Sequence, residues 1–164
     1  MQLSLIHTIL LVILASWTAQ AFSVERLVCL VNQERVSRGL KPLIVNADLN
    51  EDAQYHSQSQ ANRRQMTHNR SDRPDMGDVA RSRGYNYRSR AENVAVGDQT
   101  EESVVYKWMH SDVHRRNILT PSFTHTGAGF DPRGNYWTME FLGMDQNRID
   151  YTRYLIELDG PINA

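Results

Sequence analysis

The stretch AENVAVG at residues 91–97 places one carboxylate, Glu92, just before an apolar strand end at residues 94–96. A carboxylate that enters a buried strand must be paired, hydrogen-bonded or bound to a metal. Arg88 and Arg90 are the nearest candidates for a structural ion pair, and a ligand-binding role for the carboxylate is the alternative. The stretch therefore predicts a buried strand that carries either an internal ion pair or a binding site.

A helix is predicted directly after this strand, in the stretch TEESVVYKWM at residues 100–109. Thr100 can cap the helix, and the two glutamates that follow lie in its positive first turn. Val104, Val105 and Trp108 share one face, which should pack on the core.

The C-terminal part of the chain predicts a β-hairpin. Residues 124–131 and 136–142 have strand patterns, and the intervening Pro132-Arg133-Gly134-Asn135 reads as a turn. Residues 144–164 alternate only weakly, so we treat them as a tail of unknown role.

The N-terminal part predicts helices. Residues 24–38 carry apolar side chains at helical spacing, Gly39 offers a left-handed stop, and residues 40–43 form an extended connector. Asp48 can cap a second helix that fades near residue 64, with Glu51 completing a capping box.

A polar loop at residues 65–75 separates the second helix from a short third one at residues 76–83, which Gly84 stops. Helices therefore dominate the first two thirds of the chain and strands the last third. This order indicates an α+β fold, with helices packed on a small antiparallel sheet.

Composition narrows the function. The chain has 164 residues, enough for one ordinary domain, and 40% of them are hydrophobic, as in a globular protein. Its 18 basic and 19 acidic side chains give a formal net charge of -1. This near-equal number of charges argues against a dedicated nucleic-acid binder. It also provides no electrostatic attraction toward an anionic membrane.

Residues 1–21 have the pattern of a secretory signal peptide. Leu3–Ala15 is almost purely apolar but shorter than the roughly 20 residues that span a bilayer. Ala19-Gln20-Ala21 offers small residues for cleavage, so we expect a secreted chain that starts near Phe22. The lack of Lys or Arg in this segment leaves an uncleaved anchor as the alternative. No second such stretch follows, so no transmembrane segment is expected in the mature chain.

Cys29 is the only cysteine, so no disulfide within the chain is available. It lies between Val28 and Leu30 in an apolar stretch, which favours a buried small hydrophobe over a reactive thiol.

Five histidines follow the predicted signal peptide. His56, on the inner face of the second helix, is expected to be a packed core residue, and His125 opens a strand and can be a simple surface residue. His68 lies in the polar loop, where side chains can converge on a site or simply remain solvated.

His110 and His114 are four residues apart, a spacing that could hold zinc on one helix face. The zinc-protease motif requires Glu directly after the first histidine, and Ser111 stands there instead. Ser111, Asp112 and His114 contain the residue types of a hydrolase triad, but sequence neighbours rarely reach that geometry.

Together these segments resemble CAP-superfamily domains (cysteine-rich secretory protein, antigen 5 and pathogenesis-related proteins; the SCP domain) of the disulfide-free kind. The resembling segments are LVNQER at residues 30–35, GL and PL at 39–40 and 42–43, Ala53, His56, Ser57 and His68, AENVA at 91–95, WM at 108–109, Ser111, HRRNIL at 114–119, GAG at 127–129 and YW at 136–137. They span about residues 24–142, so residues 22–143 form the expected domain.

The resemblance implies a three-layer α-β-α sandwich with a central cleft where two histidines and acidic residues meet. Carried over by motif, these residues are His68, His114 and Glu92. In CAP proteins the cleft can take a divalent metal such as zinc. Ser111 stands where many members have a second acid, and Val113 replaces the usual glycine. The remaining His-His-Glu set could still bind zinc with water as the fourth ligand.

The resemblance also implies an extracellular role. Our leading hypothesis is a secreted, non-enzymatic binding protein for a sterol, a fatty acid or an extracellular protein partner. The lipid version predicts an apolar groove flanked by Met66, Met76, Tyr85 and Tyr87. The alternatives are a metal-dependent extracellular hydrolase and a surface module whose cleft is vestigial.

Asn69-Arg70-Ser71 is an N-glycosylation sequon directly after His68. In a eukaryote a glycan on Asn69 would crowd the cleft mouth. The alternative is that the sequon is unused or that the source is bacterial.

Overall fold

A computed structural model describes residues 21–144 of the chain. The predicted signal peptide, apart from Ala21, and residues 145–164 of the predicted tail lie outside the described residues. The boundary predicted before residue 144 is wrong by one residue, because Met144 ends the last strand. The elements are α1 (Val24–Val36), β1 (Ile44–Val45), α2 (Ala47–Arg63), α3 (Met76–Ser82), β2 (Tyr87–Val96), α4 (Glu101–Met109), α5 (Asp112–Ile118), β3 (His125–Asp131) and β4 (Tyr136–Met144).

The four strands form one sheet in the order β1-β3-β4-β2. β3 and β4 make the predicted antiparallel hairpin, and β2 pairs antiparallel with β4 so that Glu92 lies opposite Glu140. The two-residue β1 pairs parallel with β3, just after the segment expected to be only a connector. The sheet is therefore antiparallel except at one short edge.

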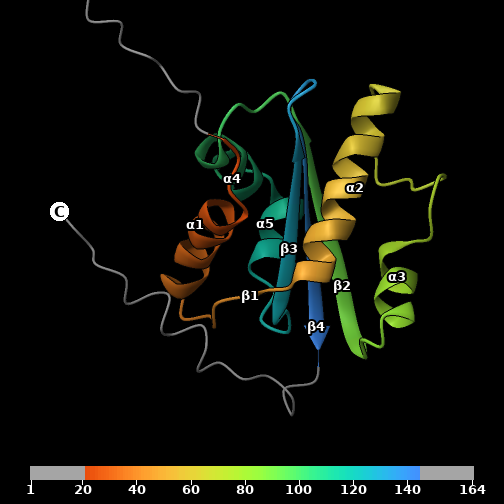
Figure 1. Ribbon diagram of the computed structural model, residues 1–164. Coiled ribbons are helices and arrows are strands. Elements are labelled where there is room, and N and C mark those ends of the chain that lie inside the picture. The colour runs from red at the N-terminus through yellow and green to blue at the C-terminus, as the bar shows by residue number, and fades with distance from the viewer. Residues whose placement is uncertain (1–20, 145–164) are drawn as a thin grey trace, which may run out of the picture.

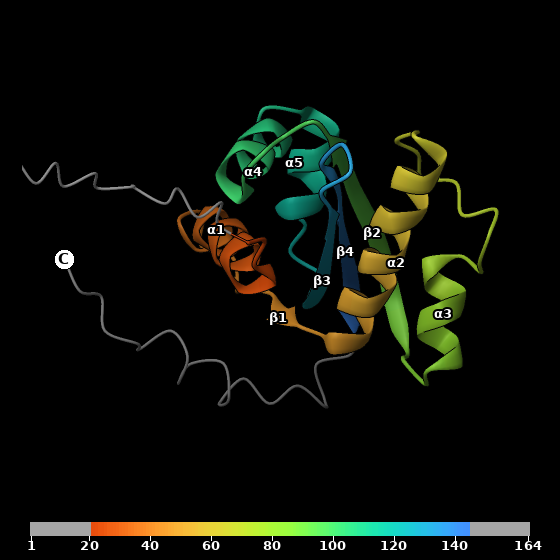
Figure 2. The same ribbon diagram turned by 45° about the horizontal axis from the view of Figure 1, so that its top comes forward.

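Helices cover both faces of this sheet. α2 and α3 lie on one side and α1, α4 and α5 on the other (Figures 1 and 2). α2 packs on β3 and β4, while α1 packs on β3 and α4. The three-layer α-β-α sandwich expected from the resemblance is confirmed.

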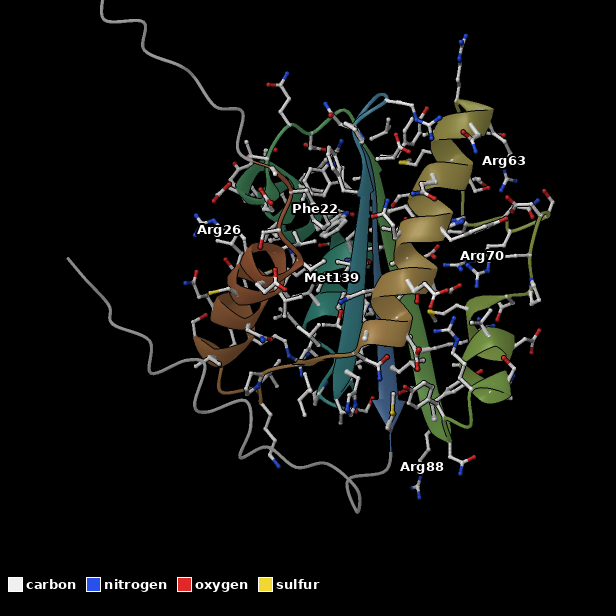
Figure 3. All side chains as sticks on the ribbon, in the orientation of Figure 1. Phe22, Arg26, Arg63, Arg70, Arg88 and Met139 are labelled. Carbon is white, nitrogen blue, oxygen red and sulfur yellow. The ribbon has the colours of Figure 1, made fainter. Side chains whose placement is uncertain are left out.

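The alternation of side chains along β4 separates the two faces. Trp137, Met139 and Phe141 belong to the main apolar core with residues of α1 and α4, and we call their side the α1 face. Thr138 and Glu140 point the other way, toward α2, and we call that side the α2 face. Figure 3 shows Met139 on the side of α1. Period-2 alternation thus gives one apolar and one largely polar face.

Two glycines of β3 let α2 lie directly on the sheet. A Cβ atom added at Gly127 would come within 2.2 Å of the Leu49 backbone, and one at Gly129 within 2.3 Å of the Gln54 backbone. Only hydrogen fits at these two positions, so α2 is held close to the sheet.

Some local predictions are wrong. Asn46, not Asp48, caps α2 by accepting a hydrogen bond from the Leu49 N–H, because Asp48 is engaged with Tyr85 and Arg83. The short helix α5 was not predicted. The predicted cap of α4 by Thr100 is confirmed.

Cys29 is exposed on α1, so its predicted burial is wrong. The core face of α1 is formed by Leu27, Val28 and Val31, and Cys29 lies on the opposite side of the helix. Apolar neighbours in the sequence did not reveal that its own position faces water.

Candidate functional site

Glu92 and His68 meet on the α2 face. Glu92 lies on β2 with its side chain only 11% exposed, and His68 lies in the loop that follows α2. The Nδ1 atom of His68 is 2.8 Å from Oε1 of Glu92. His56 of α2 reaches the same oxygen, with its Nε2 atom 3.7 Å away. Glu92 therefore orients the imidazole of His68, whereas Nε2 of His56 is 2.8 Å from the Thr67 carbonyl oxygen and bonds to it.

Arg70, two residues after His68, is the centre of the site. Its Nη1 atom donates to Oδ2 of Asp52 at 2.7 Å, and its Nη2 atom donates to Oε1 of Glu140 at 2.6 Å and also to Oε2 of Glu92. The side chain is only 5% exposed. Figure 3 shows Arg70 between α2 and the loop that leads to α3. We call Asp52, Arg70, Glu92 and Glu140 the Arg70 cluster.

Glu140 is fully buried within the Arg70 cluster. Burial, together with the charge of Asp52, raises the pKa of Glu140 well above its usual range even though Arg70 opposes the shift. Oε2 of Glu140 is buried without a hydrogen-bond donor, and Oδ1 of Asp52 lies 2.9 Å from an Nη atom of Arg73.

The other groups respond to the same charges. Burial disfavours the ionised form of Glu92, but the hydrogen bond from His68 and the charge of Arg70 hold its pKa below the usual value. The hydrogen bond to Glu92 raises the pKa of His68, whereas burial lowers the pKa of His56. Glu92 is therefore an ionised acceptor. His56 is a buried, hydrogen-bonded core residue, as predicted.

A cavity of about 300 Å³ opens beside the Arg70 cluster. Its lining combines Met76 and Ala91 with five ionisable side chains, namely His68, Arg70, Asp75, Arg90 and Glu92. Arg90 pairs with Asp75, and both side chains are about half exposed. Glu92 was predicted to form an ion pair with Arg88 or Arg90. It forms one, but its arginine partner is Arg70 of the loop after α2.

His114 does not line this cavity. It lies on α5, on the other side of the sheet, where its backbone carbonyl accepts a hydrogen bond from Asn93. Burial and the charge of His68 lower the pKa of His114, and its Nδ1 atom is buried without a hydrogen bond. The structure therefore brings His68 and Glu92 into contact. His114 interacts with His68 only through the charge of the His68 side chain.

The spacing of His110 and His114 does not give one helix face. His110 is the C-cap of α4, and Ser111 is the N-cap of α5, so the two histidines belong to different helices. His110 stacks on Tyr106, and Asp112 pairs with Arg115. Neither the two-histidine zinc arrangement nor the Ser-Asp-His triad is formed.

The donor set does not fit the divalent metal that the resemblance implies. Within residues 21–144, no group of three or more His, Cys, Asp or Glu side chains is arranged to hold a metal ion. Both oxygens of Glu92 are engaged, and the guanidinium of Arg70 lies where its carboxylates converge. Zinc binding by His68, Glu92 and His114 stays a prediction.

Sequence reasoning missed Asp52, Arg70 and Glu140. Glu140 carried the same signal as Glu92, a carboxylate inside an otherwise apolar strand at residues 136–142. Arg70 gave no such signal, because an arginine in a polar loop is ordinarily solvated. Asn69 is exposed beside it, and its use as a glycosylation site stays a prediction.

Comparisons with known proteins agree with this fold. The model of the cysteine-rich secretory protein (CAP) family matches residues 28–142, so the chain belongs to that family. The uncharacterized protein YkwD of Bacillus subtilis is 39% identical over 119 residues, which cover 73% of this chain and 46% of YkwD. The membrane protein YlbC of the same organism is 26% identical over 75% of this chain and 35% of its own length. The chain thus spans less than half the length of these curated relatives.

Solved structures show the same fold. An extracellular SCP-domain protein of Bacillus anthracis superposes with a TM-score of 0.67 at 22% identity, covering 73% of this chain and 39% of that one. An outer surface protein of Borrelia burgdorferi gives a TM-score of 0.64 at 17% identity, covering 74% of this chain and 92% of that one. Among residues 21–144, no helix is both long and apolar enough to cross a membrane.

Proposed function

We propose that this chain is a secreted, non-enzymatic binding protein whose cavity takes a polar peptide segment of an extracellular protein partner. The chemistry of the cavity lining carries this proposal. Five of its seven lining residues are ionisable, and only Met76 and Ala91 offer apolar surface. A sterol or fatty acid needs a predominantly apolar wall, whereas peptide groups need placed hydrogen-bonding partners.

The side chains expected to line a lipid groove have other roles. Tyr85 donates its hydroxyl hydrogen to Asp48, and Met66 is exposed in the loop outside the cavity lining. Met76 is buried in a small apolar cluster with Leu49, Ala80 and Leu142, against which Tyr87 packs. These contacts favour the protein-partner version of the binding hypothesis over the lipid version.

Three lining groups are accessible to a partner. His68 is 61% exposed, and its Nδ1 atom is directed at Glu92. Arg90 and Asp75 form an exposed ion pair that a peptide carboxylate or ammonium group can exchange with. Arg70 is buried and shapes the floor.

The alternative of a metal-dependent hydrolase has less support. It requires a metal to activate water, and the arrangement of the described carboxylates and histidines does not supply the ligands.

The binding proposal is tested by selecting displayed random peptides on the immobilised chain, with matched selections on His68→Ala and Arg90→Ala. Peptides enriched on the unchanged chain and bound at least about tenfold more weakly by either variant would support it. Parallel titrations with oleate and cholesterol provide the control. Saturable lipid binding without peptide enrichment would contradict the proposal and indicate that the ligand is a lipid.

The proposed secretion has a separate test. The apolar segment at residues 3–15 and the small residues at 19–21 support cleavage before Phe22. N-terminal sequencing of protein from the culture medium should begin at Phe22. Retention in the cell membrane with residue 1 intact would favour the uncleaved anchor.

A further inference from the structure

We propose that Arg70 is a built-in cation that occupies an acidic site on the α2 face and thereby keeps divalent metal ions out of it. This inference does not depend on which ligand the cavity binds. It concerns three carboxylates from three elements, Asp52 of α2, Glu92 of β2 and Glu140 of β4, which converge on one guanidinium.

The three acidic side chains surround one guanidinium. Each of the three carboxylates directs one oxygen at Arg70, at 2.7 Å for Asp52 and 2.6 Å for Glu140. These two are fully buried in the sheet–helix interface, and the Glu92 side chain is 11% exposed. A nearby cation stabilises acidic side chains packed so closely, and their oxygens are ligands that Mn²⁺ and Ca²⁺ prefer.

One unpartnered atom points to the same site. Oε2 of Glu140 is buried without a hydrogen-bond donor, whereas Oδ1 of Asp52 faces Arg73. Arg73 lies 2.9 Å from that Asp52 oxygen, so it neutralises part of the charge, but it makes no ion pair with Glu92 or Glu140 among the described contacts. Arg70 alone joins all three carboxylates, so its removal should expose a set of oxygen ligands.

The test measures Mn²⁺ binding by the full chain. Binding is detected as a decrease of the electron paramagnetic resonance signal of free Mn²⁺. The unchanged chain should bind no stoichiometric Mn²⁺, and neither should Arg70→Lys, which keeps a cation. Arg70→Met should bind one Mn²⁺ per chain at least about 100-fold more tightly than the unchanged chain. Adding Glu140→Gln to Arg70→Met removes one ligand and should weaken that binding.

Arg70→Met leaves buried carboxylates without their cation, so its folding must be monitored by circular dichroism with and without Mn²⁺. A melting temperature that Mn²⁺ raises by at least about 5 °C supports the proposal. If Arg70→Met does not fold, Arg70→Gln takes its place in the same assays. If neither variant folds in either condition, the carboxylates cannot exchange the guanidinium for a metal, and the proposal is rejected.

Two further results overturn the proposal. One is a folded Arg70→Met that binds no Mn²⁺. The other is an unchanged chain that binds one Mn²⁺ or Zn²⁺ tightly and loses it in Glu92→Gln, which would mean that Arg70 does not exclude a metal from the site.

Discussion

The two faces of the sheet differ in what holds them, with apolar packing on the α1 face and polar contacts on the α2 face. On the α1 face, Trp137, Met139 and Phe141 pack against apolar side chains of the flanking helices. On the α2 face, one residue away in the same strand, Thr138 bonds to Ser57 and Gln60, and Glu140 bonds to Arg70. A single strand therefore carries both an apolar core and a buried polar network.

The comparison separates stability from function. Apolar packing depends on volume and area, so the α1 face tolerates conservative exchange and gives the fold its stability. A buried charge network depends on each partner being present, and replacing it by apolar groups often costs nothing. We infer that the α2 face is maintained for the cavity beside it.

The largest expected effect is on the α1 face. Phe141 is fully buried and stacks on Phe123 with ring centroids 5.6 Å apart. Phe141→Ala should lower the free energy of unfolding by about 3–5 kcal/mol, through lost burial and the cavity left behind. Urea titrations at pH 5 and pH 8 should give the same loss, because no charge is involved. A loss below about 1 kcal/mol, or one that varies with pH, would contradict the division between the faces.

The next effect concerns how closely α2 lies on the sheet. Gly129→Ala places a Cβ atom 2.3 Å from the Gln54 backbone, so α2 must move outward. We expect a loss of about 1–3 kcal/mol in thermal or urea unfolding, and a larger one for Gly129→Val. An alanine variant as stable as the unchanged chain would show that α2 shifts freely, and the Arg70 cluster would then not be held by helix packing.

Most of the fold was predictable because its signals are local. The hairpin followed from alternation on both sides of Pro132-Arg133-Gly134-Asn135, and α4 followed from the cap at Thr100. The contact between His68 and Glu92 came only from family resemblance, and its geometry agrees. Arg70 was missed because its burial depends on the long-range placement of Glu140, 70 residues away.

A smaller, pH-dependent effect is expected at Glu140. Its pKa is raised in the folded state by burial and by the charge of Asp52, so the unfolded chain ionises first as pH rises. The contribution of Glu140 to the free energy of unfolding is fully present at pH values below the usual glutamate pKa. It decreases as pH rises from that value to the raised pKa of the folded state. Glu140→Gln keeps the neutral hydrogen bonds and removes this loss.

The Glu140→Gln variant should therefore differ from the unchanged chain by no more than about 1.5 kcal/mol at pH 5 and become relatively more stable by pH 8. Urea unfolding between these values measures the trend, with Thr138→Val as a neighbouring variant that introduces no titrating group. A relative stability that falls with pH would mean that Glu140 is ionised in the folded chain.

The smallest effect is expected at His68, where the polar face meets solvent. Its hydrogen bond to Glu92 raises its pKa, so its stabilisation is present below the ordinary histidine value and is lost as pH rises through the folded value. Because the side chain is 61% exposed, His68→Asn should cost less than about 1 kcal/mol at pH 5.5 and still less at pH 8. Nuclear magnetic resonance titration should find the His68 pKa above that of a free histidine and lower it in Glu92→Gln. An unchanged pKa in that variant would mean that Glu92 does not hold the imidazole, and the cavity would lose the one oriented histidine on which peptide binding depends.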